Sequence, residues 1–78
     1  MSELLRLRHL RGLTQDDLAV LTGKSRVAIS LFERGLRRPA PETVVKLAHA
    51  LRVSSTRLNA TLPDAPVEDE PAGEAVTS

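Results

Sequence analysis

The segment from residue 26 to residue 34 combines residue types that could bind the edges of base pairs. At about 100° per residue, Ala28, Ile29 and Phe32 would share one side of a helix, and the opposite side would present Arg26, Val27, Ser30, Leu31 and Arg34. An arginine can donate two hydrogen bonds to O6 and N7 of guanine, and valine or leucine can pack against a thymine methyl group. Exposed branched apolar residues lower solubility unless they contact a partner, so this side is expected to bind something.

Capping and stop signals divide the sequence into five short helices. The first spans about residues 2–11 and stops at Gly12. Thr14 and Asp17 form an approximate capping box for the second helix, which Gly23 ends. Ser25 caps a third helix, over about residues 26–34, which Gly35 closes. Pro41 suits the first position of a fourth helix, whose buried stripe would be Val44, Leu47, Ala48 and Leu51, and Ser54 can cap a fifth that carries Leu58. No stretch alternates long enough to predict a strand, so the fold class is all-α.

The second and third helices are joined by a short turn that contains a glycine. Ala19 is small enough to let a neighbouring helix approach, Gly23 follows four residues later, and Ile29 lies six residues further on as a core anchor. A capped helix, a three- to four-residue turn with glycine and a second helix make a helix-turn-helix, whose second helix can lie in the DNA major groove. Residues 15–34 therefore predict this motif.

Residues 4–62, about three quarters of the chain, resemble the helix-turn-helix domain of the Cro/phage-repressor (XRE) family of transcriptional regulators. The resemblance rests on LTQ at 13–15, IS at 29–30, ERG at 33–35 and LAHAL at 47–51. It implies a lambda-repressor-like domain of five helices that binds double-stranded DNA in a sequence-specific manner.

The resemblance also implies roles for single residues. The base-reading positions would be Arg26, Val27, Ser30 and Leu31, and the phosphate contacts would come from Gln15, Lys24, Ser25, Arg34, Arg37 and Arg38. For Lys24, in the turn, a phosphate contact and a surface lysine remain equal alternatives. Arg8 and Glu33 would form a semi-buried ion pair between the first and third helices. Ala40 stands where a capping Ser or Thr is common, which weakens the start of the fourth helix by about 1 kcal/mol.

The overall net charge of +1 conceals two oppositely charged parts. Residues 1–62 hold eleven Lys and Arg against five Asp and Glu, a net charge of +6, whereas residues 63–78 hold five acids and no base, a net charge of −5. We therefore expect a DNA-binding domain at 1–62 and an acidic tail at 63–78, which contains three prolines and no aromatic residue. Such a segment cannot bury enough apolar surface to offset its ordering entropy, which predicts disorder. The tail would increase solubility, or its charge would compete with phosphate for the basic domain.

Enzymatic and metal-binding functions find little support in the sequence. His9 and His49 have no second ligand at helical spacing, and the chain has no cysteine. Asp16 and Asp17 lie side by side at a helix start, where negative charge favours the helix dipole, and no glycine-rich phosphate loop or nucleophile elbow is present. We expect no enzyme activity, no metal and no cofactor. No apolar run approaches the roughly 18 residues of a membrane span, which predicts a cytoplasmic protein that does not bind membranes.

The sequence therefore predicts a DNA-binding transcriptional regulator that represses by occupying a promoter. Because one recognition helix contacts few base pairs, we expect a homodimer on an inverted repeat with half-site centres about 34 Å apart, or a multiple of that distance. Candidate dimer residues are Leu5, Leu10, Leu58 and Leu62. The alternative is an antitoxin or adaptor of the same fold, whose main partner is a protein that docks on the tail or on Val27 and Leu31.

Overall fold

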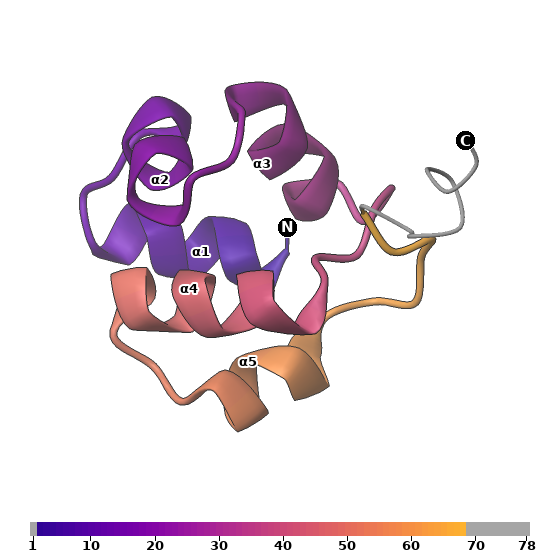
Figure 1. The fold of residues 1–78 in the computed structure, drawn as a ribbon. Coiled ribbons are helices and arrows are strands. Elements are labelled where there is room, and N and C mark those ends of the chain that lie inside the picture. Colours follow the sequence, from indigo (N-terminus) through magenta and orange to yellow (C-terminus); the bar gives the residue numbers. More distant parts are fainter. Residues whose placement is uncertain (1, 69–78) are drawn as a thin grey trace.

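Five short helices make up the computed structural model, which describes residues 2–68 (Figure 1). They are α1 (Glu3–Leu10), α2 (Gln15–Thr22), α3 (Arg26–Glu33), α4 (Pro41–Leu51) and α5 (Ser55–Thr61). The all-α prediction is confirmed. Within residues 2–68, the β-type pairing recorded is an isolated parallel bridge between Arg38 and Val67.

Side-chain caps start four of the helices, three of them at the predicted residues Thr14, Ser25 and Ser54, and the fourth at Ser2, which was expected inside the first helix. The hydroxyl oxygens of Ser2, Thr14, Ser25 and Ser54 each accept a hydrogen bond from the backbone N–H three residues further on. The Thr14–Asp17 capping box is complete, because the carboxylate of Asp17 also accepts from the N–H of Thr14 at 2.9 Å. The fourth helix differs, since its N-cap residue Ala40 has no side chain that can cap, as predicted.

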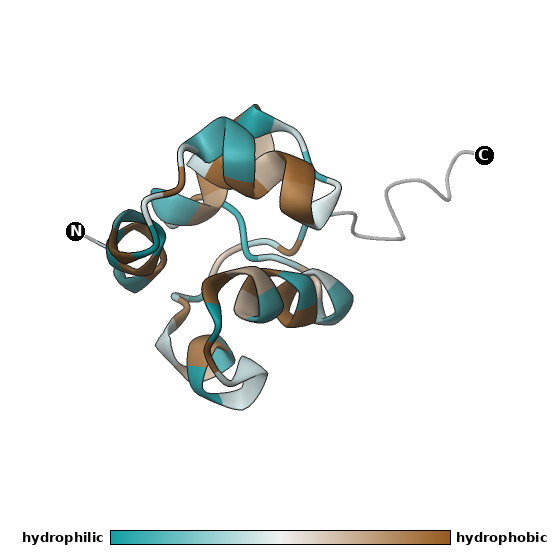
Figure 2. Ribbon diagram, turned by 90° about the vertical axis from the view of Figure 1, so that its left-hand side faces the viewer, coloured by the Kyte–Doolittle hydropathy of each residue, from teal (hydrophilic) through white to brown (hydrophobic). Residues whose placement is uncertain are grey.

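The apolar sides of all five helices meet in one core. The core residues Leu4, Leu18, Ile29, Phe32, Leu47, Leu51 and Leu58 are each at most 1% exposed. In Figures 1 and 2, α2 and α3 lie at one end of the molecule and α5 at the other, with α4 between them. Figure 2 shows hydrophobic and hydrophilic residues alternating around the helices, as expected for helices that each turn one side toward a shared interior.

Two of the candidate dimer residues have very different positions in the monomer. The side chain of Leu58 is 1% exposed and belongs to the core, so this residue is not available for a dimer surface. Leu10, by contrast, is 64% exposed at the end of α1.

The first part of the predicted acidic tail, residues 63–68, lies against the helical domain. Figure 1 shows this segment, in orange, returning from α5 toward the loop that follows α3. The backbone N–H of Arg38 donates to the carbonyl oxygen of Pro66 at 2.8 Å, and the N–H of Glu68 donates to the carbonyl oxygen of Arg38 at 2.8 Å. The prediction of disorder considered apolar burial, whereas polar contacts hold these six residues. The rest of the predicted tail, residues 69–78, lies outside the described residues.

Candidate nucleic-acid interface

The turn between α2 and α3 is short because a glycine reverses the backbone. Gly23 has φ of 71°, in the left-handed region that favours glycine. The N–H of Lys24 then donates to the carbonyl oxygen of Ala19 at 2.9 Å, which closes the end of α2. Ser25 starts α3 by accepting from the N–H of Ala28. Ala19 and Ile29 are both buried, so the two helices pack closely at the predicted positions.

The outer side of α3 is open to solvent. Val27 is 68% exposed, whereas Ile29 on the same helix is fully buried. Arg26 and Arg34 are exposed at the two ends of the helix, and Ser30 and Leu31 are half-buried. A depression of about 190 Å³ on this side is lined by five residues, all of them predicted to contact DNA: Gln15, Arg26, Val27, Ser30 and Arg34.

The buried ion pair expected between Arg8 and Glu33 is present and joins α1 to α3. Their side chains are 8% and 4% exposed, and two guanidinium nitrogens of Arg8, Nε and Nη2, donate to the carboxylate of Glu33. The third nitrogen, Nη1, donates to the carbonyl oxygen of Leu13 at 2.9 Å. Arg8 therefore fixes the end of α3 and the loop before α2 at the same time.

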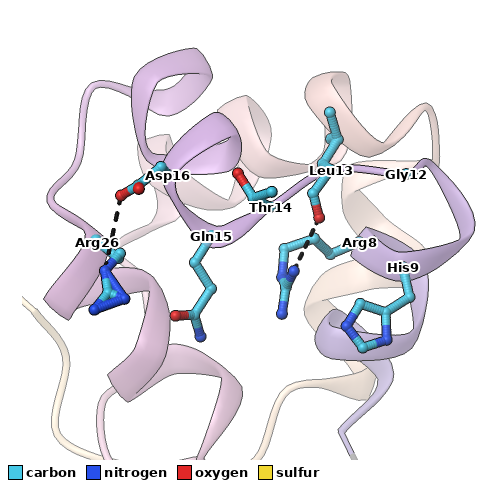
Figure 3. Close-up of a pocket in the computed structure, with 8 residues that line it drawn as sticks. All are labelled: Arg8, His9, Gly12, Leu13, Thr14, Gln15, Asp16 and Arg26. Carbon is cyan, nitrogen blue, oxygen red and sulfur yellow. Dashed lines mark hydrogen bonds and ion pairs between the residues drawn. The ribbon is translucent and has the colours of Figure 1, made fainter.

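Gln15, the first residue of α2, is held by the same carboxylate. Its Nε2 donates to Oε1 of Glu33 at 2.9 Å. An amide nitrogen carries two hydrogens, so the second can still be donated to a phosphate oxygen. Figure 3 shows the Gln15 side chain between those of Arg8 and Arg26. The Arg8–Glu33 pair therefore positions a predicted DNA-contact residue as well as stabilising the core.

A wider groove of about 550 Å³ lies beside Gln15 and also contains His9 (Figure 3). His9 is exposed near the end of α1 and lines this groove together with Arg8 and Arg26. In the sequence, His9 has no second metal ligand at helical spacing, which indicated no site for it. Its placement depends on how α1 packs against α3, which local sequence does not reveal.

Arg26 is one of the four predicted base-reading residues, and its side chain is only loosely held. Its Nε lies 3.8 Å from Oδ1 of Asp16, and the two side chains are 62% and 78% exposed. Such surface pairs contribute about 0–1 kcal/mol and are screened by salt. The guanidinium can therefore exchange this carboxylate for a base edge at small cost.

The other predicted phosphate contacts fall into two groups. Ser25, Arg34 and Arg37 are exposed. Lys24 and Arg38 are engaged by the end of the described chain: Nζ of Lys24 lies 3.0 Å from Oε1 of Glu68, and the Arg38 guanidinium donates to carbonyl oxygens of Asn59, Leu62 and Pro63. No local pattern in the sequence indicates these contacts, since the partners lie more than twenty positions apart.

The fold and this surface together define the class of protein: a small helical domain in which α3, the second helix of a helix-turn-helix, starts at a side-chain cap and exposes one face flanked by arginines. Residues 4–58 match the family model described as helix-turn-helix. The chain is also 42% identical over 57 residues to an uncharacterized HTH-type transcriptional regulator, y4dJ, of Sinorhizobium fredii, an alignment that covers 73% of this chain and 74% of that protein. The chain belongs to the XRE-type helix-turn-helix family of DNA-binding transcriptional regulators.

Among residues 2–68, no group of three or more His, Cys, Asp or Glu side chains is arranged to hold a metal ion. In the same part of the chain, every helix is too short or too polar to cross a membrane.

Proposed function

We propose that the protein regulates transcription by inserting α3 into the major groove of double-stranded DNA. Arg26, Val27, Ser30 and Leu31 would contact base edges, and Gln15, Ser25, Arg34 and Arg37 would contact phosphates, with Lys24 and Arg38 joining them once their present partners are displaced. The observation that carries this proposal is that Val27 is 68% exposed on a helix whose other side is buried, with exposed arginines at both ends.

We further propose that the mode of regulation is repression by a dimer. A single α3 helix contacts too few base pairs for high specificity, so two copies would bind an inverted repeat with half-site centres about 34 Å apart. Occupation of such a site within a promoter would exclude RNA polymerase. Selection of bound duplexes from random DNA would give the operator, and sedimentation of the complex would show whether two chains bind each duplex.

Two arginine variants test the proposed roles on the selected operator. Arg26→Ala should reduce discrimination at one base pair by about 1–3 kcal/mol, because the direct readout of that pair is lost. Arg34→Ala should instead weaken binding to all sequences alike, because phosphate contacts carry no sequence information. Equal losses on every sequence for Arg26→Ala would contradict its reading role.

The salt response separates this function from protein docking. DNA binding should weaken with salt with a log–log slope of about −0.9 for each phosphate neutralised. An antitoxin or adaptor that docks through the apolar residues Val27 and Leu31 should respond little to salt. No measurable affinity for duplex DNA at low salt would reject the DNA-binding proposal and favour the protein partner.

A further inference from the structure

We propose that residues 63–68, here called the strap, form an autoinhibitory contact that competes with DNA phosphates for the cations beside the helix-turn-helix. The proposal rests on the proposed DNA-binding function. It adds a regulated step: the protein must release the strap to use Lys24 on DNA. The central residue of the strap is Glu68, whose carboxylate takes the place on Lys24 that a phosphate oxygen would otherwise occupy.

The contacts of Glu68 are those of a bound anion. Its Oε1 lies 3.0 Å from Nζ of Lys24, and its Oε2 accepts from the backbone N–H of Ala40 at 3.1 Å. The side chains of Glu68 and Lys24 are 9% and 21% exposed, so this pair is better shielded from water and salt than the exposed Arg26–Asp16 pair. While this contact persists, Lys24 offers little positive charge to DNA.

Arg38 is engaged partly by the strap and partly by Asn59 and Leu62, which precede it. Its guanidinium donates to Oδ1 of Asn59 at 2.6 Å and to the carbonyl oxygens of Leu62 and Pro63 at 3.0 and 3.3 Å. Its backbone N–H and carbonyl pair with Pro66 and Glu68. Two of the four cations predicted to contact phosphate, Lys24 and Arg38, are thus bound within the monomer.

The strap is held in a way that permits release. Pro63, Asp64 and Pro66 are exposed, and Ala65 and Val67 are only half-buried, so little apolar surface is covered. Segments with few buried apolar contacts open at low free-energy cost. A row of DNA phosphates carries a high density of negative charge, which can replace the single carboxylate of Glu68.

The first test compares two substitutions that remove one negative charge each. Glu68→Gln keeps an amide oxygen that can accept from the N–H of Ala40, and it removes the negative charge that faces Lys24. Asp64→Asn removes the negative charge of an exposed strap residue. The probe is a mixed-sequence duplex titrated by fluorescence anisotropy between about 50 and 200 mM salt, a range in which phosphate contacts are readily measured. Circular dichroism and thermal melting would check that both variants fold.

Glu68→Gln should strengthen binding by about tenfold at 50 mM salt and make the log–log salt slope more negative by about 0.9, the values for one additional phosphate contact. Asp64→Asn should change the affinity by less than about twofold, because an exposed charge is screened at this ionic strength. Equal effects of the two substitutions would overturn the proposal, because they would reflect net charge alone.

A second test places the effect on Lys24, and its first comparison does not use Glu68→Gln. In the unsubstituted background, Lys24→Gln should weaken binding far less than Arg34→Gln, because Lys24 must first give up Glu68. In the Glu68→Gln background, Lys24→Gln should abolish the tenfold gain. Equal losses for Lys24→Gln and Arg34→Gln in the unsubstituted protein, or a gain that persists without Lys24, would refute the strap as a competitor.

The same titrations separate the two proposals. If the unsubstituted protein binds the duplex and Arg34→Gln weakens binding while Glu68→Gln has no effect, only the autoinhibitory contact is rejected. If no variant binds, both proposals fail.

Discussion

Replacing Glu33 with glutamine should destabilise the domain more than any comparable change of a surface charge. The carboxylate of Glu33 accepts three hydrogen bonds, two from Arg8 and one from Gln15, in a site where the Arg8 side chain is 8% exposed. A glutamine is nearly the same size but has one acceptor oxygen and turns an N–H₂ group toward these donors. The guanidinium of Arg8 would then be buried without a counter-charge.

The expected loss is large compared with the stability of a domain this small. Breaking a buried ion pair by removing one partner costs about 3–5 kcal/mol. Hydrogen bonds to charged groups contribute about 1.5–3 kcal/mol each, so the loss of one or two gives a similar value. Native domains have unfolding free energies of about 5–15 kcal/mol, and each kcal/mol lowers Tm by about 4–8 °C at this size. Glu33→Gln should therefore lower Tm by more than about 12 °C.

Urea unfolding followed by circular dichroism at 222 nm measures this loss, and the exposed pair Arg6–Glu3 supplies the control. Glu3→Gln also replaces a carboxylate that accepts two hydrogen bonds from an arginine, but in solvent, so its effect should be close to zero. The double variant Arg8→Met with Glu33→Leu should regain most of the lost stability, because buried ion pairs can often be replaced by apolar residues of similar volume. A loss for Glu33→Gln no larger than that for Glu3→Gln, or a double variant as unstable as the single one, would refute the reasoning.

Three further predictions concern local structure. Gly23→Ala should cost about 1–2 kcal/mol through backbone strain alone, because no atom lies within 4 Å of the added Cβ; a loss above this range in urea unfolding would indicate a steric clash. Ala40→Ser should stabilise α4 by about 1 kcal/mol, since the N-cap has extended backbone geometry but no capping side chain, and an unchanged or lower urea midpoint would contradict this. The N–H of Thr14, followed by its hydroxyl, lowers the pKa of Asp17 below its ordinary value. The stability that this carboxylate contributes is therefore fully present above the unfolded-state pKa of about 3.9, and it is lost as pH falls through the lower folded-state pKa. Asp17→Asn should accordingly flatten the acid limb of the curve of stability against pH. An NMR titration in which the Asp17 carboxyl has a midpoint at or above about 3.9 would contradict the lowered pKa.

The helix boundaries were predictable from sequence because their signals are local. Thr14 and Asp17 satisfy each other's backbone groups within one turn, and Gly23 takes a backbone angle that other residues avoid. The buried side of α3 was also predictable, because Ile29 and Phe32 repeat at helical spacing. These rules involve residues only three or four positions apart, which is why they need no knowledge of the tertiary fold.

The contacts of Arg38 and Glu68 could not be predicted in this way. Arg38 bonds to residues 21 to 25 positions away, and Glu68 bonds to Ala40 across 28 positions. Polar side chains with such distant partners leave no periodic pattern in the sequence. The resemblance places Arg38 among the phosphate contacts, and the structure adds that its guanidinium has partners within the monomer. Leu58 shows the same limit for apolar residues, since helical spacing alone does not decide whether a leucine faces the core or a second subunit.

The acceptor for the N–H of Ala40 has a consequence for how the molecule opens. In four helices the N-cap hydroxyl accepts a hydrogen bond from the backbone N–H three residues further on. Ala40, the N-cap of α4, has no hydroxyl, and its own backbone N–H donates to the carboxylate of Glu68. Native-state hydrogen exchange should therefore find the amide of Ala40 exchanging in step with that of Glu68, and faster than the interior of α4. A ligand that displaces residues 63–68 would speed the hydrogen exchange of the Ala40 amide at the beginning of α4, although Ala40 lies far along the chain from the displaced segment.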